Sequence, residues 1–203
     1  MPAKLLMITR YPVKSDKLSD FASYLAKNSA GKILEALDDD EVLELLTVSD
    51  DASFVDYSLA DQSVFQAQGS ALRGDVRREL VSFVEAPKNT DNLIPDTTYI
   101  QLRHVEVKPD QMKAYRQWRD ETIFDVVRTN DEVEVFLAYH SVISNQPGVM
   151  FISGFSGDVE QYASVFNSDR YKQIVQEAGD QYITGGTDGL YTKIYREHSK
   201  IAA

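Results

Sequence analysis

The chain has 203 residues, of which 43% are hydrophobic and 26% charged, and its formal net charge is −11. This composition is typical of a folded globular protein and excludes a largely disordered chain. The acidic excess repels phosphate groups, so we expect neither nucleic acid nor an anionic membrane as a partner. The sequence contains no cysteine, which excludes disulfides, thiolate metal sites and thiol nucleophiles. Apolar runs of a few residues fall far short of the roughly 20 needed to span a membrane, and we expect a cytoplasmic protein.

Hydrophobic periodicity predicts alternating strands and helices along the first part of the chain. A short acidic turn at Asp50-Asp51 is expected to join two strands into a hairpin. The predicted elements are a strand at Leu5–Tyr11, a helix from about Asp16, strands at Val42–Val48 and Ser53–Leu59, a helix from about Ser63, and a strand at Glu79–Glu85.

The second part repeats this order. Pro109 is placed at a helix start, where its missing N–H costs nothing. The predicted elements are a strand at Thr98–Val107, a helix burying Met112, Tyr115 and Trp118, a hairpin of Val133–Val142 and Gly148–Phe155, a helix from about Val159 to Ala178, and a strand at Gly189–Arg196.

Three short matches link the two parts. VKSDKLSDFASYL from Val13 recurs as VKPDQMKAYRQW from Val107, at an offset of 94 residues. Asp40-Glu41-Val42 before LELLTVS recurs as Asp131-Glu132-Val133 before EVFLAYHS, and SVFQA aligns loosely with DVEQYA. Matches in the same order indicate a duplicated domain. We predict one repeat over residues 1–88, a linker over 89–97 and a second repeat over 98–203.

The order β-α-β-β-α-β, found twice, is that of the ferredoxin-like unit. Right-handed crossovers place both helices of each unit on one face of an antiparallel sheet, and the bare face must be buried. We therefore predict an α+β protein whose two sheets pack face to face. On this element order the chain resembles the dimeric α/β-barrel superfamily, which includes the antibiotic biosynthesis monooxygenases and the chlorite dismutases. The repeats could pair within one chain or across a homodimer.

Strand alternation predicts which side chains face the interior between the sheets. In the strand at Thr98–Val107, the purely apolar pair Ile100 and Leu102 suits the helix side. The mixed set on the opposite face is then expected inside. The candidate interior residues in the second repeat are Gln101, Arg103, Phe136, His140, Phe151, Ser153 and Tyr191.

These residues also have structural interpretations. Arg103 could form an ion pair at the barrel rim, and His140 could face solvent or hold a structural hydrogen bond. Tyr115 and Trp118 have the helical spacing of core residues. His198 is expected in a charged tail.

The resemblance implies a cofactor-independent monooxygenase-like enzyme acting on a small aromatic or polyketide-like molecule, in which the substrate carbanion itself reduces dioxygen. Within this hypothesis His140 is the base and Arg103 and Gln101 are donors to the developing oxyanion. Phe136, Phe151, Ser153 and Tyr191 would bind the ligand.

Two alternatives stay open. One is haem binding, with His140 or His104 as the axial ligand. His104 is otherwise expected at the surface. The other is a non-catalytic small-ligand-binding or structural protein. The sequence has no metal-binding histidine spacing, no phosphate loop and no hydrolase elbow.

Overall fold

The computed structural model describes residues 1–49 and 54–200, and eight strands of this part close into one antiparallel barrel in the order β1-β3-β2-β8-β5-β7-β6-β4. The strands are β1 (Leu5–Pro12), β2 (Lys32–Ala36), β3 (Glu41–Thr47), β4 (Arg77–Lys88), β5 (Tyr99–Val105), β6 (Val135–Ile143), β7 (Val149–Phe155) and β8 (Leu190–Glu197). The main helices are α1 (Leu18–Asn28), α2 (Phe54–Gln68), α3 (Met112–Glu121), α4 (Ile123–Arg128), α5 (Val159–Asn167) and α6 (Asp169–Gln181).

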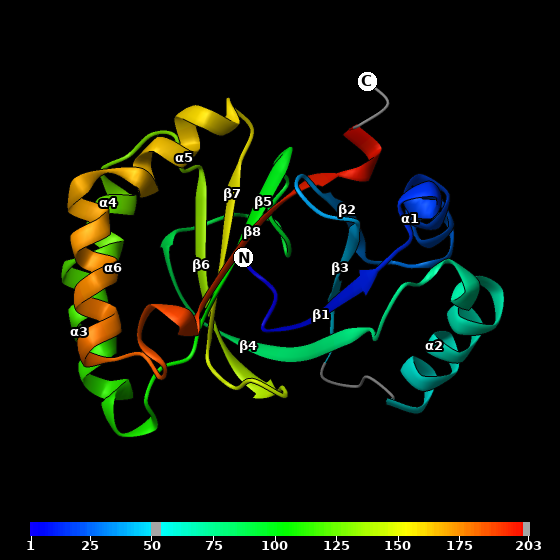
Figure 1. Ribbon diagram of the computed structural model, residues 1–203, viewed down its shortest axis with the longest axis horizontal. Helices are drawn as coiled ribbons and strands as arrows, with labels where there is room; N and C mark the ends of the chain where they lie inside the picture. The colour runs from blue at the N-terminus through cyan, green and yellow to red at the C-terminus, as the bar shows by residue number, and fades with distance from the viewer. Residues whose placement is uncertain (50–53, 201–203) are drawn as a thin grey trace.

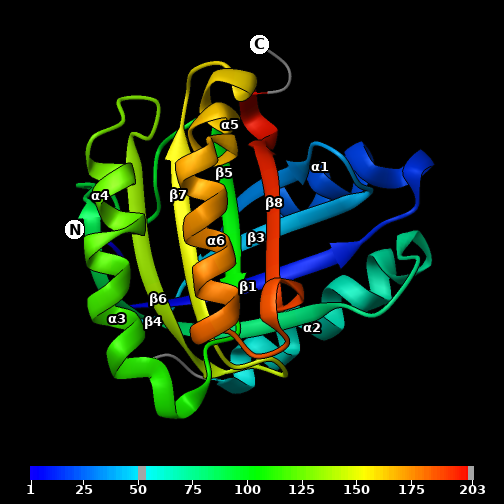
Figure 2. The ribbon, with the colours of Figure 1, turned by 60° about the vertical axis from the view of Figure 1, so that its left-hand side comes forward.

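Each half of the chain contributes four adjacent strands, and in each the order is fourth, first, third, second. This is the strand order of a ferredoxin-like sheet. The two sheets join edge to edge, through β2 with β8 and β4 with β6. Helices α1 and α2 cover one outer side of the barrel, and α3 to α6 cover the opposite side (Figures 1 and 2). The expected shared interior between the two sheets is therefore present, and hydrogen bonds close it on both edges.

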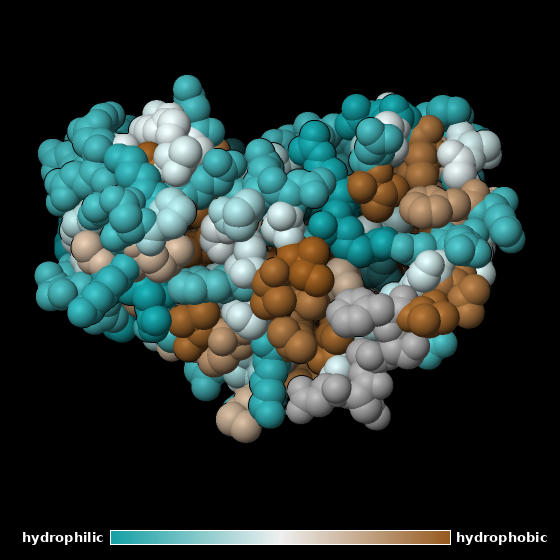
Figure 3. Space-filling view, turned by 90° about the horizontal axis from the view of Figure 1, so that it is seen from below, coloured by the Kyte–Doolittle hydropathy of each residue, from teal (hydrophilic) through white to brown (hydrophobic). Residues whose placement is uncertain are grey.

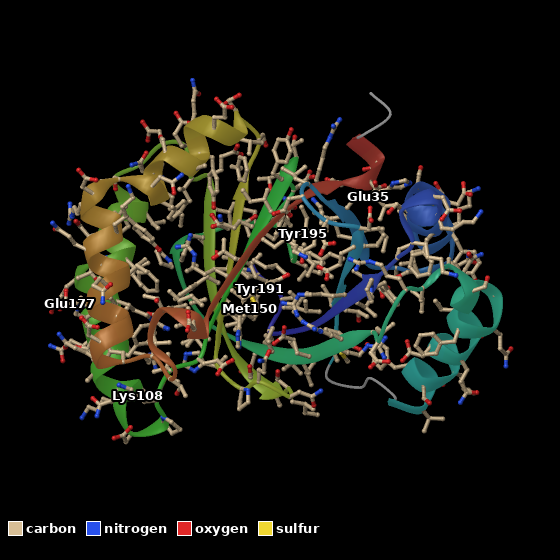
Figure 4. The ribbon with its side chains drawn as sticks, viewed as in Figure 1. Glu35, Lys108, Met150, Glu177, Tyr191 and Tyr195 are labelled. Atoms are coloured by element: carbon tan, nitrogen blue, oxygen red, sulfur yellow. The ribbon has the colours of Figure 1, made fainter. Side chains whose placement is uncertain are left out.

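The centre of the barrel interior is apolar. It is filled from all eight strands, by residues such as Leu6, Leu43, Ile100, Met150 and Tyr195, and every member of this buried cluster lies on a strand. Tyr195 and Met150 lie in the space between the two groups of helices (Figure 4). Burying this many aliphatic side chains supplies much of the driving force for folding.

Further cores lie outside the barrel, between its outer face and the helices. In the second half, Phe136, Phe151 and Val105 of the sheet pack on Tyr115 and Phe124 of α3 and α4. The prediction that Ile100 and Leu102 face the helices is therefore wrong. They point into the barrel, while the mixed set with Gln101 and Arg103 faces the helices. Alternation separated the two faces of β5, β6 and β7 correctly but assigned them the wrong way round, whereas on β8 Tyr191 faces the interior as predicted.

The predicted hairpin of the first half is also wrong. The hairpin is made by β2 and β3, and residues from Phe54 onward form α2. The remainder of the predicted arm, Ser53 with the turn at Asp50-Asp51, lies outside the described residues. Strand β3 is the second strand of the hairpin β2–β3. The sequence after Val133, which the repeat aligns with β3, leads instead into β6, the first strand of the hairpin β6–β7. The sequence match between these two stretches therefore does not join equivalent strands.

The face of the molecule seen from below carries hydrophilic side chains interrupted by apolar patches (Figure 3). The most exposed large apolar side chains include Val55 and Leu59 of α2 and Val142 and Ile143 of β6. No helix among the described residues is long and apolar enough to cross a membrane.

Candidate functional site

A cleft of about 300 Å³ lies between the outer face of β5, β7 and β8 and the helices of the second half. Most of its lining is apolar, with Phe151 on the sheet side and Phe166 and Ile174 on the helix side. Its polar groups come from Gln101, Arg103, Tyr115, Asn167, Tyr171 and Thr192. An apolar cavity with a few convergent polar groups is the usual form of a small-molecule site.

Helix capping sets the position of the residues from α5 and α6. The Asp158 carboxylate accepts hydrogen bonds from the N–H groups of Glu160 and Gln161, both at 2.9 Å, and starts α5. Ser168 caps α6 by accepting from the N–H of Tyr171 at 3.2 Å. These two caps bring Tyr162 and Tyr171 over the sheet, where both are buried.

Among the described residues that line the cleft, Arg103 is the one with a charge. Its Nη1 donates to the Tyr171 hydroxyl and its Nε lies 3.3 Å from Thr192 Oγ1. The guanidinium also lies 4.6 Å from the centre of the Phe166 ring. Within the described residues no carboxylate pairs with Arg103, so the expected rim ion pair is absent. The cleft therefore carries an uncompensated positive charge, although the chain is acidic.

Gln101 lies beside Arg103 and is 5% exposed. Its Oε1 accepts a hydrogen bond from the Tyr162 hydroxyl at 3.0 Å, and Arg103 Nη2 lies 3.4 Å away. In the β5–β7 register Gln101 is opposite Ser153, whose hydroxyl donates to the Val135 carbonyl at 3.2 Å. The Tyr162 ring stacks on Phe155 at 3.7 Å. This network fixes the Gln101 amide at the polar end of the cleft.

The tyrosine hydroxyls of the cleft are held in their protonated, neutral form. Burial raises the pKa of Tyr115 and of Tyr171 above its ordinary value, since the phenolate form would be poorly solvated. The Tyr115 hydroxyl has no hydrogen-bond partner among the described residues. A buried donor without a partner is costly, and a ligand oxygen in the cleft would satisfy it.

His140 does not line this cleft. It lies on β6, in register with Ser82 of β4 and next to α3. Its pKa is lowered to about 4, first by burial and then by the charges of Arg119 and Arg116. Its Nε2 is buried and has no partner in the described part of the chain. At neutral pH this imidazole is uncharged, and it is separated from the groups around Arg103.

Tyr191 lies on the inner side of β8, at one mouth of the barrel. Arg10 and Lys193 lie over its ring, at 5.6 and 5.7 Å from the ring centre. His104 also faces this mouth and is 7% exposed, not at the surface as expected. Its Nε2 lies 2.9 Å from the Gln146 carbonyl oxygen.

The structure thus brings together part of the predicted site. Gln101, Arg103 and Phe151 line one cleft, and Ser153 and Phe136 lie beside or behind it. His140 and Tyr191 lie elsewhere. Tyr162 and Tyr171 were not predicted from the sequence. The spacing of Tyr171, Ile174 and Ala178 on α6 marks the face that packs on the sheet, and this is the signal that could have found Tyr171.

The first half has a larger cleft of about 650 Å³ in the corresponding place, between its sheet and helices α1 and α2. Its polar groups pair with one another. The Tyr11 hydroxyl donates to Glu44 at 2.9 Å, and Arg78 pairs with Asp61. Among the described residues that line this cleft the cation, Arg78, is paired with a carboxylate, whereas Arg103 is not.

The residues present do not fit haem in the Arg103 cleft. The axial ligand expected for haem is His140 or His104, and neither lines this cleft among the described residues. No group of three or more potential metal ligands occurs among the described residues.

No family model and no curated protein matches the sequence. Solved structures do match. An anthrone oxidase-like protein has a TM-score of 0.64 and 11% identity, covering 95% of this chain and 90% of that one. A ferredoxin-fold protein from Listeria monocytogenes, related to antibiotic biosynthesis monooxygenases, has a TM-score of 0.55 and 8% identity, covering 96% and 95%. This chain shares their ferredoxin-like fold. A haem-degrading enzyme from Listeria monocytogenes also matches, with a TM-score of 0.56 and 10% identity, covering 96% and 99%. At these identities the likeness concerns the fold.

Proposed function

We propose that the chain is a cofactor-independent monooxygenase-like enzyme that oxidises a small aromatic molecule in the Arg103 cleft. The observation that carries the proposal is the unpaired Arg103 guanidinium at the polar end of an otherwise apolar cavity. An aromatic substrate would pack between Phe151 and Phe166. Its carbonyl oxygen would lie toward Arg103 and the Tyr115 hydroxyl.

In this chemistry the substrate supplies the electrons. Loss of a proton next to the carbonyl gives an enolate, whose oxygen is stabilised by Arg103. The carbanion carbon reduces dioxygen, one oxygen atom enters the product as a carbonyl, and the other leaves as water. For anthrone the balance is anthrone plus dioxygen giving anthraquinone plus water.

The proposal assigns no general base to the cleft. Its tyrosines are held neutral by burial, and His140 lies outside it. Stabilising the enolate lowers the pKa of the substrate itself, so water can take the proton. Gln101 and Tyr162 would orient Arg103 and define the polar end. His140 is left out of the proposed site.

The experiment is oxygen uptake with anthrone, with the uncatalysed rate subtracted. Arg103→Gln is expected to lower the rate roughly 100-fold or more, the usual cost of losing an oxyanion donor. Arg78→Gln in the cleft of the first half is the matched control and should keep the rate. Equal rates in wild type and Arg103→Gln would contradict the proposal, and so would the absence of any rate above the blank.

A non-catalytic small-ligand binder is the second candidate, since an apolar cleft with one cation binds aromatic anions without reacting. Binding of anthrone without oxygen uptake would favour it.

We also propose that residues 1–88 and 98–203 arose by duplication, with 89–97 as the linker. The common strand order of the two halves supports this. On this proposal one chain supplies both sheets, so a monomer is sufficient to close the barrel.

A further inference from the structure

Three side chains from distant parts of the chain meet on the outer face of β2, far from the Arg103 cleft. Ser23 lies on α1, Glu35 on β2 and His198 on the 3₁₀ turn His198–Lys200 that follows β8. Figure 1 shows this turn beside α1 and β2, and Figure 4 labels Glu35 there. His198 Nδ1 lies 2.6 Å from Glu35 Oε1, and His198 Nε2 lies 3.1 Å from Ser23 Oγ.

In the neutral tautomer with its proton on Nδ1, His198 joins the three groups in one direction. A carboxylate can only accept, so Nδ1 carries the proton that bonds to Glu35. Nε2 of the neutral ring is then an acceptor, and Ser23 Oγ–H donates to it. This is the arrangement of a serine nucleophile, a histidine base and an orienting carboxylate.

The local fold holds the three groups in place. Strand β2 turns Leu34 into the barrel, so Glu35 points outward toward α1. Helix α1 packs on the sheet through Phe21, Ala22 and Leu25, and this seats Ser23 above β2. The side chains of His198 and Glu35 are 18% and 13% exposed, so the base is partly shielded but reachable.

We propose that Ser23, His198 and Glu35 form a second reactive site, in which Ser23 attacks small activated esters. The Ser23 Oγ–carbon bond forms while His198 Nε2 takes the hydroxyl proton. That proton passes to the leaving alkoxide or phenoxide as the ester bond breaks. Water then releases the acid by the reverse sequence.

The structure also limits the rate of this site. Ser23 lies within a helix, where backbone N–H groups bind the carbonyl four residues earlier and are not free to hold an oxyanion. Lys27, one turn further along α1, is the cation on the same helix face. We therefore expect covalent modification of Ser23 and slow turnover, since a missing oxyanion donor costs roughly 10²–10³-fold.

The test is labelling of the full chain with a fluorophosphonate probe, followed by peptide mass spectrometry. The Ser23 oxygen–phosphorus bond forms as fluoride leaves, and the label should be found on Ser23. His198→Ala is expected to slow labelling by roughly 100-fold or more, and Glu35→Gln should slow it less.

Ser63 is the matched internal control. It is also a serine within a helix, but its hydroxyl donates to the Leu59 carbonyl at 3.0 Å, so it should stay unlabelled. Two results with the wild-type chain would overturn the proposal. One is that Ser23 carries no label, and the other is that Ser63 is labelled as much as Ser23. Equal labelling rates in wild type and His198→Ala would also overturn it. None of these outcomes bears on oxygen uptake in the Arg103 cleft.

Discussion

Tyr195 of β8 and Glu41 of β3 meet inside the barrel, where the phenol donates to the carboxylate oxygen at 2.6 Å across 154 residues of sequence. Lys193 approaches the same carboxylate oxygen at 3.4 Å. The pKa of Tyr195 is raised, first by burial and then by the Glu41 charge. The contact links the two halves near the β2–β8 seam.

Tyr195→Phe is expected to destabilise the fold. The buried Glu41 carboxylate would lose a donor, at a typical cost of about 1–3 kcal/mol. The measurement is the free energy of unfolding in urea. Tyr191→Phe, whose ring is half-buried at the barrel mouth, is the control and should cost less. A change below about 0.5 kcal/mol for Tyr195→Phe would show that water or Lys193 satisfies Glu41 instead.

His140 predicts a pH dependence of stability. Its pKa is lowered to about 4 in the folded chain, against about 6.5 when unfolded. Between these pH values the unfolded chain binds a proton that the folded chain does not. The free energy of unfolding is therefore at its full value above about pH 6.5 and decreases as the pH falls toward 4.

The comparison is with His140→Gln, measured by urea unfolding at several pH values. The wild type should lose more stability than the variant between pH 6.5 and 4. The groups facing His140 are Arg116 and Arg119 of α3 and Glu85 of β4. Parallel pH curves for the two proteins would show that the imidazole is not held neutral by the fold.

Arg119 is fully buried and pairs with Glu85, and its guanidinium lies over the rings of Phe124, Tyr115 and Phe151. Because its charge helps to lower the pKa of His140, Arg119→Met should raise that pKa. Methionine keeps most of the packing volume. NMR titration of the His140 ring protons is the measurement, and Arg128→Met is the control. An unchanged His140 pKa would mean that burial and Arg116 set it without Arg119.

Two tyrosines of the second half give a matched pair. Tyr162→Phe removes a hydroxyl that donates to Gln101 and should cost about 1 kcal/mol. Tyr115→Phe removes a buried hydroxyl with no partner among the described residues, so stability should stay the same or increase. Thermal unfolding of the two variants side by side is the measurement. An equal loss in both would indicate a partner for Tyr115, such as a bound water.

The element order could be read from the sequence because both halves carry strong periodic signals, such as the helix at Leu18 and its counterpart at Met112. Strand β2 was missed because it has five residues and its apolar pair Ile33-Leu34 lies between polar ones. Residues 54–59 alternate enough to look like a strand, yet they form the start of α2.

The candidate site was only partly predictable. Both faces of each barrel sheet are covered, one by the other strands and one by helices, so both carry apolar residues. Alternation then separates the faces without telling which is inside. Gln101 and Arg103 were selected because they are polar. They line a cleft even though their face of the sheet is the outer one. His140 was selected because an imidazole can act as a base. Its burial beneath α3 results from packing between elements that are distant in the sequence, so the local pattern could not predict it.

The edge pairing of β2 with β8 and β4 with β6 has a consequence for any attempt to separate the halves. A fragment ending near Lys88 would leave the outer strands β2 and β4 unpaired and its leucine-rich inner face open to water. Both defects are removed at once if two such fragments assemble around a twofold axis. Cleavage in the segment after Lys88 should therefore yield self-associating fragments and not independent monomers.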